Sequence, residues 1–295
     1  MKYVSRLIFI IAISFTCFAQ SQADFAVAQR TLGREGKFQA ADGVEKFSFP
    51  RTDLSVSIGA TRLEPAAALG SWIAFRRSGS GFVADGDLVL RAAEVGPVIS
   101  ALIGGGVEIA GIHNHLVGEV PAVTYVHFFA RGQIEQLAST FRSALNVTAT
   151  PLAAPSPPAK PQPFAHQDVI EKILGKSGAP NGKALAFSFP RSHPITMHGE
   201  TLPPSMGMAT AVNFQSSPQG VAATGDFVLT SEEVPKVLAV LRKNGIQVTA
   251  LHNHLLDDRP AMYFMHFWAE GKAESVAAGL KQALDAASGG SRSNP

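Results

Sequence analysis

The sequence predicts an α+β protein built from two tandem copies of one module, each an antiparallel sheet with helices on one face. Two observations carry this prediction. Short motifs return in the same order, because FSFPR at Phe47–Arg51 recurs at Phe187–Arg191, and GDLVL at Gly86–Leu90 recurs as GDFVL at Gly225–Leu229. Within each copy, segments with the period of a strand alternate with segments with the period of a helix.

The first copy shows the expected order of elements. GDLVL predicts a strand, and residues 92–106 predict the first helix, which ends in a run of glycines. Residues 107–115 and 122–130 are rich in β-branched and aromatic residues and predict a hairpin. Residues 133–145 place apolar side chains on one helical face and predict the second helix.

This β-α-β-β-α order suits the ferredoxin-like kind of α+β layer. Further strands are expected before it, at residues 46–51, 54–59 and 71–76. Each module is therefore expected to be a ferredoxin-like sheet that is extended by extra N-terminal strands.

The chain divides into five segments. A start with Lys2 and Arg6, an apolar run and small residues up to Ala23 predict a secretory signal peptide that is cleaved before Asp24. The stretch TATPLAAPSPPAKPQP predicts an extended linker between the copies. The expected segments are 1–23 (signal peptide), 24–149 (first module), 150–164 (linker), 165–286 (second module) and 287–295 (flexible tail).

Composition narrows the class of protein. Hydrophobic residues make up 46% of the chain and charged residues 16%, as in globular proteins. The net charge is +2 and the basic residues are spread among acids, which gives no support for nucleic-acid binding. The only cysteine, Cys17, lies in the predicted signal peptide, and its context SFTC departs from a lipidation box. We expect a periplasmic or secreted protein with no disulfide, no lipid anchor and no membrane span after signal cleavage.

Six of the nine histidines fall in two matching blocks, GIHNHLVGEVPAVTYVHFFARG and ALHNHLLDDRPAMYFMHFWAEG. Alternate side chains on a strand share a face, so His113 and His115 are expected to point the same way. In a hairpin centred near residue 120, His127 lies across from His113, and Tyr125 lies opposite His115. The second block repeats this arrangement with Phe264 opposite the second histidine. Its three histidines are His252, His254 and His266.

Three neutral imidazoles on one face are the ligand set of a tetrahedral zinc ion with an open fourth position. We predict a divalent metal site in each module, with zinc favoured, although imidazole also suits copper, nickel and iron. An open position would support metal-assisted hydrolysis or hydration. The modules can also pack about a pseudo-two-fold axis, and the histidine faces then line one shared cleft. No clear nucleophile or general base is visible, so the sequence does not decide whether the protein is an enzyme.

Two other interpretations stay open. The histidines can belong to a metal-free cleft for an unknown small molecule, anionic or sugar-like, with Tyr125 and Arg51 as further contacts. They can also pack as structural side chains without a ligand. Arg191 matches Arg51, and Asn114 matches Asn253, so these residues are candidate contacts to a ligand or to the histidines.

Four acidic residues also recur at matching positions. Asp87 and Asp226 follow a glycine at the start of a strand and are expected in turns. If they reach the histidine face, they can orient an imidazole or act as a base on metal-bound water. Glu94 and Glu233 are expected to be first-turn carboxylates that the helix dipole favours.

The repeated motifs resemble the LppY/LpqO family of bacterial exported proteins, also called domain of unknown function 1259. The resemblance lies in three blocks, each present in two versions: FSFPRTDLSVSIG, GDLVL and HNHL…P…HF…G. The resemblance covers nearly all of the mature chain. It implies two tandem copies of the domain and an exported protein, often a lipoprotein, and it carries no established activity.

Overall fold

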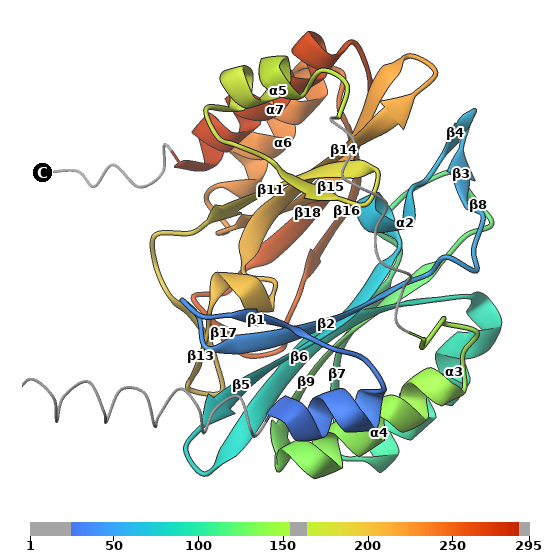
Figure 1. Cartoon of the computed structure of the whole chain (residues 1–295). Helices are drawn as coiled ribbons and strands as arrows, with labels where there is room; N and C mark the ends of the chain where they lie inside the picture. The colour runs from blue at the N-terminus through green and yellow to red at the C-terminus, as the bar shows by residue number, and fades with distance from the viewer. Residues whose placement is uncertain (1–24, 154–163, 289–295) are drawn as a thin grey trace, which may run out of the picture.

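The computed structural model describes residues 25–153 and 164–288. Within them the chain forms two similar halves in four layers, with helices, a sheet, a second sheet and helices again (Figure 1). The predicted signal peptide, residues 154–163 of the predicted linker and residues 289–295 of the predicted tail lie outside the described residues. The last helix, α7 (Ala273–Ser288), continues two residues into the predicted tail.

Each half contains one six-stranded antiparallel sheet, and the strands follow the same order in both. The first sheet consists, from edge to edge, of β1 (Lys37–Gln39), β2 (Val44–Pro50), β5 (Gly70–Ser78), β6 (Gly81–Leu90), β9 (Thr124–Gly132) and β7 (Glu108–His113). The second consists of β10 (Ala179–Asn181), β11 (Ala184–Pro190), β14 (Ala209–Ser217), β15 (Gly220–Leu229), β18 (Tyr263–Gly271) and β16 (Gln247–Asn253). β7 and β16 are therefore matching edge strands.

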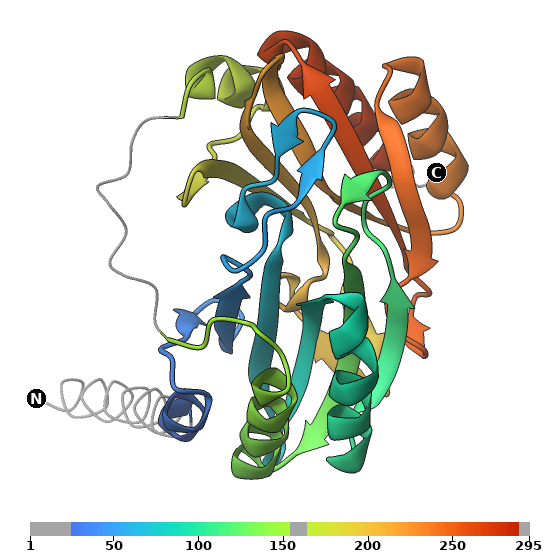
Figure 2. The same ribbon diagram turned by 90° about the vertical axis from the view of Figure 1, so that its right-hand side faces the viewer.

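Helices cover the outer face of each sheet, and they lie at the two ends of the stack in both views (Figures 1 and 2). On the first sheet these are the helix of residues 25–32, α3 (Ala92–Gly104) and α4 (Ile134–Asn146); on the second they are α5 (Gln167–Leu174), α6 (Val234–Lys243) and α7. In α4, Leu137 and Phe141 share the buried face, and the Phe141 ring contacts Phe75 of the sheet with centroids 5.8 Å apart. No helix of the described chain has both the length and the apolar character that a membrane span requires.

The two halves exchange arms across the space between the sheets. The arm of the first half consists of β3 (Ser57–Ile58), β4 (Thr61–Arg62) and α2 (Pro65–Ala68), and β3 also pairs with β8 (Glu119–Val120). It lies against the second sheet, where Leu63 joins a buried cluster with Ala222 and Trp268. The Gln215 side chain fixes the arm by accepting from the Glu64 N–H at 2.9 Å.

The arm of the second half lies against the first sheet in the same way. It consists of β12 (Ile195–Met197), β13 (Glu200–Leu202) and the 3₁₀ turn η1 (Pro204–Met206), and β12 also pairs with β17 (Asp258–Arg259). Met197 and Met206 pack in one buried cluster with Ala74 and Val83 of the first sheet. Each inner sheet face is thus covered by the other half, so the space between the sheets is one shared interior.

Most predicted elements are found where they were expected. The order β-α-β-β-α is confirmed by β6, α3, β7, β9 and α4, and the predicted strands 46–51 and 71–76 correspond to β2 and β5. The predicted strand 54–59 is wrong, because only Ser57–Ile58 is extended and it belongs to the exchanged arm rather than to the main sheet. The ferredoxin-like assignment of each module stays a prediction.

The glycine of GDLVL and GDFVL is required by a close approach of the neighbouring strand. A Cβ at Gly225 would lie 1.9 Å from the carbonyl oxygen of Ala211, and one at Gly86 would lie 2.3 Å from the ring of Phe128. We expect Gly225→Ala to lower the free energy of unfolding by at least about 1–3 kcal/mol, because β14 has to move. Chemical denaturation measures this. Gly96→Ala, at an open position of α3, is the control and is expected to be neutral or stabilising; equal stability of the two variants would contradict the clash.

Candidate metal centre

The histidines of both blocks lie on the inner faces of the two sheets, where the halves meet. His127 of β9 pairs with Asp87 of β6, and His266 of β18 pairs with Asp226 of β15. Paired residues of neighbouring strands point to the same face. Each aspartate therefore lies beside its histidine in the shared interior. The expectation that Asp87 and Asp226 lie in turns is wrong, because both are inside strands that begin several residues earlier.

The pairing register differs by two residues from the predicted one. Tyr125 pairs with His113 instead of His115, and His127 pairs with Gly111. The pairing of β7 with β9 is irregular between Ile109 and Gly111, and the connection between them contains β8, which pairs with β3 of the exchanged arm. A slip of two residues preserves which face each side chain occupies, so the three histidines still converge.

Aromatic rings hold two of the imidazoles in place. His115 lies beyond the end of β7, and its ring stacks on Tyr125 with centroids 3.5 Å apart. The Tyr125 hydroxyl donates to the carbonyl oxygen of Ala68 at 2.8 Å. In the second half, Phe264 pairs with His252 instead of the predicted His254. The Phe264 ring nevertheless stacks on the His254 ring, with centroids 4.2 Å apart.

The six histidines form one cluster across the interface rather than one cluster in each half. Every ring lies against a ring of the other half. The three pairs, with their centroid separations, are His113 with His252 (3.7 Å), His115 with His266 (3.8 Å) and His127 with His254 (4.1 Å). Neither half alone can produce this arrangement.

Four of these histidines bring nitrogen atoms close enough for one metal ion. The ligand atoms of His113, His115, His127 and His252 all lie within 4.8 Å of one another. His115 Nε2 and His127 Nε2 are 3.4 Å apart. A tetrahedron with Zn–N bonds of about 2.0–2.1 Å has edges of about 3.3 Å, so this pair already has the required spacing.

Hydrogen bonds at Nδ1 leave Nε2 as the metal-binding atom of two rings. His113 Nδ1 lies 3.2 Å from the carbonyl oxygen of Asn114, and His252 Nδ1 lies 2.8 Å from that of Asn253. A carbonyl oxygen only accepts, so Nδ1 carries the proton and Nε2 keeps its lone pair. His113 Nε2 is buried and has no hydrogen-bond partner among the described residues.

Burial also favours the neutral form of the imidazoles. It lowers the pKa of His113, and together with His113 it lowers the pKa of His252 to about 4. For His115 and His127, burial lowers the pKa well below its ordinary value and the neighbouring imidazoles lower it further. Neutral imidazole is the form that binds a metal ion.

Asp87 lies between two of these rings. Its Oδ2 is 3.8 Å from His115 Nε2, and its Oδ1 is 3.7 Å from His127 Nδ1. Burial raises the pKa of Asp87 well above its ordinary value, and the carboxyls of Asp226 and Asp85 raise it further. A cation beside the rings would favour the ionised form, which can orient His127 by accepting from Nδ1–H.

The predicted asparagines stabilise loops instead of reaching toward a ligand. The Asn114 side-chain amide donates to the carbonyl oxygen of Val123 at 2.8 Å, and that of Asn253 donates to the carbonyl oxygen of Leu255 at 3.0 Å. These bonds fix the chain that follows each His-Asn-His.

The predicted arginines bind carboxylates at the start of a helix. Arg51 is 0% exposed, and its guanidinium donates to Glu94 at 2.8 Å and to Asp53 at 2.9 Å. Arg191 donates to Glu233 at 2.8 Å. Glu94 also accepts from the main chain at the start of its own helix. The guanidiniums are therefore committed to these ion pairs, and Arg51 has no exposed surface with which to meet an anionic ligand.

A protein family matches both halves of the chain. The family described as Domain of Unknown Function (DUF1259) matches residues 26–147 and 168–286. The chain belongs to this family. The resemblance noted in the repeated motifs is thereby confirmed, with two tandem DUF1259 copies that together make the histidine cluster.

Comparisons with curated proteins and with solved structures give less information about this chain. No curated protein matches the chain. Among solved structures, the trimeric bacterial microcompartment shell protein PduB is 8% identical, with 86% of this chain and 90% of that chain covered and a TM-score of 0.25. EtuB from Clostridium kluyveri is 11% identical, with 85% and 91% covered and a TM-score of 0.21. These TM-scores are too low to carry an argument about the DUF1259 fold or its function.

Three side chains at this centre were not predicted from the sequence. Lys46, Trp72 and Asp85 occupy the inner face of the first sheet, and the corresponding positions of the second DUF1259 copy hold Ala186, Ala211 and Thr224. The prediction rested on residues that recur in both copies, so it passed over these three. Alternation along β6 was the available signal, since Asp85 must share the face of Asp87.

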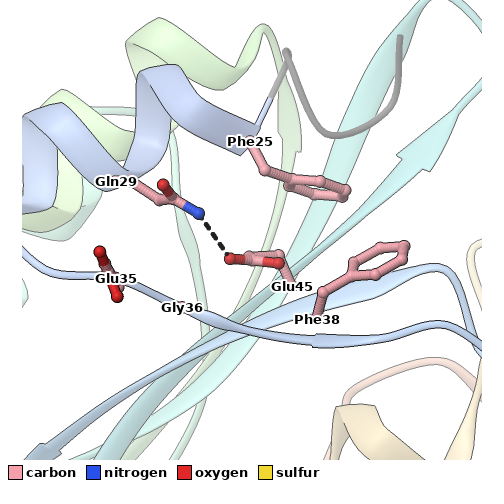
Figure 3. Close-up of a pocket in the computed structure, with 6 residues that line it drawn as sticks. All are labelled: Phe25, Gln29, Glu35, Gly36, Phe38 and Glu45. Atoms are coloured by element: carbon pink, nitrogen blue, oxygen red, sulfur yellow. Dashed lines mark hydrogen bonds between the residues drawn. The ribbon is translucent and has the colours of Figure 1, made fainter. Parts of the chain in front are cut away.

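A separate pocket lies on the outer face of the first sheet. It has a volume of about 440 Å³, and the Glu45 carboxylate in it accepts from the Gln29 side chain at 2.9 Å. Figure 3 shows this pair with Phe25 and Phe38, which also line the pocket. Glu45 and Lys46 are consecutive on β2, so they point to opposite faces. This pocket is therefore separated from the histidine cluster by the sheet.

Proposed function

We propose that this DUF1259 protein binds one divalent transition metal ion, with zinc favoured, between its two copies through His113, His115, His127 and His252. The observation that carries the proposal is the approach of four imidazole ligand atoms within 4.8 Å of one another. The neutral state that burial imposes supports it, as do the Nδ1–carbonyl contacts that leave a lone pair on Nε2 of His113 and His252. The His252 Nε2 lone pair faces His266 Nε2 at 2.9 Å, so a metal ion would replace this contact.

The four-histidine ligand set supports binding of a metal ion more strongly than it supports hydrolysis by that ion. Hydrolysis requires a coordination position for water, and four imidazoles fill a tetrahedral shell. Hydrolysis would therefore need a fifth position, or the departure of His252, the single ligand from the second copy. The rival proposal, a metal-free site for an anionic ligand, is weakened because Arg51 is buried in its ion pairs with Glu94 and Asp53.

We also propose that the protein works in the periplasm or as a secreted protein after cleavage at Ala23. The support is the sequence pattern of the first 23 residues. With Cys17 removed, the mature chain has no thiol, so thiolate ligands are excluded. Mass spectrometry of the exported protein is expected to find Asp24 at its N-terminus.

Elemental analysis tests the metal proposal directly. The mature chain, purified without a histidine tag, is expected to contain zinc or another divalent transition metal, to lose it on chelation and to take it up again on titration. Absence of transition metal combined with no uptake by the chelated protein would contradict the proposal.

A further inference from the structure

The second copy has a pocket at a position where the first copy is closed. It has a volume of about 710 Å³ and lies where the end of β11, the start of α6 and the end of α7 come together. Its lining includes the guanidinium of Arg191, the ammonium of Lys236 and the apolar side chains of Phe189 and Leu284. Among the described residues that line it there is no ligand of the four-histidine site. The pocket is therefore a separate site.

In the first copy, carboxylates occupy both edges of the matching guanidinium. Arg51 donates from Nη1 and Nη2 to Glu94, and from Nε and Nη2 to the two oxygens of Asp53 at 2.9 Å each. The main chain that follows α4 also crosses this ion pair, since the Ala149 N–H donates to Glu94 Oε1 at 3.0 Å. The Arg51 side chain is consequently 0% exposed.

In the second copy, one edge of the guanidinium stays open. Arg191 donates from Nη1 and Nη2 to Glu233, at 2.8 and 3.0 Å, and Nη1 also donates to the carbonyl oxygen of Val228. His193 occupies the sequence position of Asp53, and among the described residues no group accepts a hydrogen bond from Arg191 Nε. The Arg191 side chain is 18% exposed, and it lines the pocket.

The chain that covers the ion pair in the first copy takes a different course in the second. In the first copy α4 ends at Asn146, and Thr150 in the stretch that follows is buried. In the second copy α7 continues to Ser288, which is the position that matches Ala149. This stretch therefore stays helical instead of turning across the ion pair, and Arg191 remains partly exposed.

We propose that this pocket binds a small organic carboxylate, anchored on the edge of Arg191 formed by Nε and Nη2. The first copy supplies the precedent, because Asp53 binds the same edge of Arg51 through both of its oxygens. The planar fork of a guanidinium matches the two oxygens of a carboxylate in this way. The side chains of Phe189 and Leu284 suit an apolar body attached to the carboxylate.

The charges around the open edge balance, so they do not repel an anion. Arg191 and Glu233 neutralise each other in their ion pair. Glu232 is the other carboxylate in the lining, and the ammonium of Lys236 nearby offsets its charge. A bound carboxylate would thus meet the donors of Arg191 without an uncompensated negative charge beside them.

Titration of the mature chain with benzoate, followed by NMR, tests the proposal. The chain is expected to bind one benzoate with a dissociation constant of about 1 mM or lower. Benzamide has the same shape without the charge, and it is expected to bind at least about 10-fold more weakly, because hydrogen bonds between charged groups are the stronger ones. Removal of metal by chelation is expected to leave the benzoate affinity unchanged, since the pocket is separate from the histidines.

A matched pair of variants at His193 identifies the anchor. His193→Asp restores the carboxylate of the first copy, which should occupy the open edge of Arg191 and weaken benzoate binding at least about 10-fold, because the internal carboxylate has the higher effective concentration. His193→Asn has nearly the same size without the charge, and it is expected to bind benzoate as the wild-type chain does. Thermal melts establish that both variants are folded.

Four results would overturn the carboxylate site. They are no saturable binding of benzoate up to about 10 mM, equal binding of benzamide and benzoate, undiminished binding by His193→Asp, and binding that disappears when metal is removed. The last result would place benzoate at the histidines. The first three would leave the proposed metal ion untouched, and a chain without metal that still binds benzoate would refute the proposed function alone.

Discussion

His252→Ala is expected to weaken binding of the metal ion at the four-histidine site by at least about 100-fold, since even the loss of a partner that only orients a ligand costs about 10–100-fold. The other three ligands, His113, His115 and His127, belong to the first copy. Competition against a chelator of known affinity measures the change. The result distinguishes a shared site from an autonomous one, because a site confined to the first copy would be unaffected by a substitution in the second.

The control for this experiment is His193→Ala. His193 is exposed and has no counterpart in the other copy, so its loss should leave the affinity unchanged. Thermal melts of the chelated variants exclude a general loss of fold. If His252→Ala bound the metal as tightly as the wild-type chain, His252 would not be a ligand and the shared site would be refuted.

Arg51→Met is expected to lower the free energy of unfolding by about 3 kcal/mol, because it removes the buried cation of Glu94 and leaves that carboxylate with only Arg91, whose side chain is 52% exposed. Arg51 is fully buried between Glu94 and Asp53. Arg191→Met is the matched variant in the second copy. The Arg191 side chain is 18% exposed, and among the carboxylates of the described chain it pairs with Glu233 alone. We therefore expect Arg191→Met to lower the free energy of unfolding by less than Arg51→Met does. Urea denaturation of the chelated proteins measures both, and equal losses would contradict the reasoning.

The same ion pair predicts a dependence of stability on pH. Burial alone would raise the pKa of Glu94, but hydrogen bonds from Arg51 and from main-chain N–H groups outweigh it and lower the pKa from 4.5 to about 2. A group with a lowered pKa in the folded state stabilises the fold fully above its unfolded value. This contribution is therefore present above about pH 4.5 and is lost as the pH falls toward 2. Arg51→Met should flatten that part of the stability curve, and an unchanged slope would count against the pair.

The repeated architecture could be predicted because it depends on local patterns. Two local patterns were sufficient to predict two α+β modules in tandem. They are the periods of strands and helices, and the recurrence of FSFPR and GDLVL. The exchanged arms could not be predicted in this way. Residues 54–59 have the composition of a strand, but they leave their own sheet, and Leu54 and Val56 pack in one buried cluster with Trp268 of the other sheet. Such a choice depends on tertiary contacts and not on local propensity.

The candidate site was predictable in its members but not in its assembly. Strand alternation correctly placed His113 and His127 on one face, and a register error of two residues did not change that face. It was wrong for His115 and His254, which lie beyond the ends of β7 and β16 and reach the cluster from the loops that follow. Which rings meet depends on how two sheets stack, and the stacking brings His127 against His254 rather than leaving each trio separate. Asp85 was missed because it has no partner in the second copy, although it shares a strand face with Asp87.

Anomalous diffraction at the zinc edge, from crystals of the mature chain grown with zinc, tests the shared site most directly. We predict a peak bonded to Nε2 of His113 and to His252, with His115 and His127 completing the shell, so that one ion joins the two copies. Two peaks, each bonded only to the three histidines of a single copy, or the absence of any peak at the histidines, would contradict it.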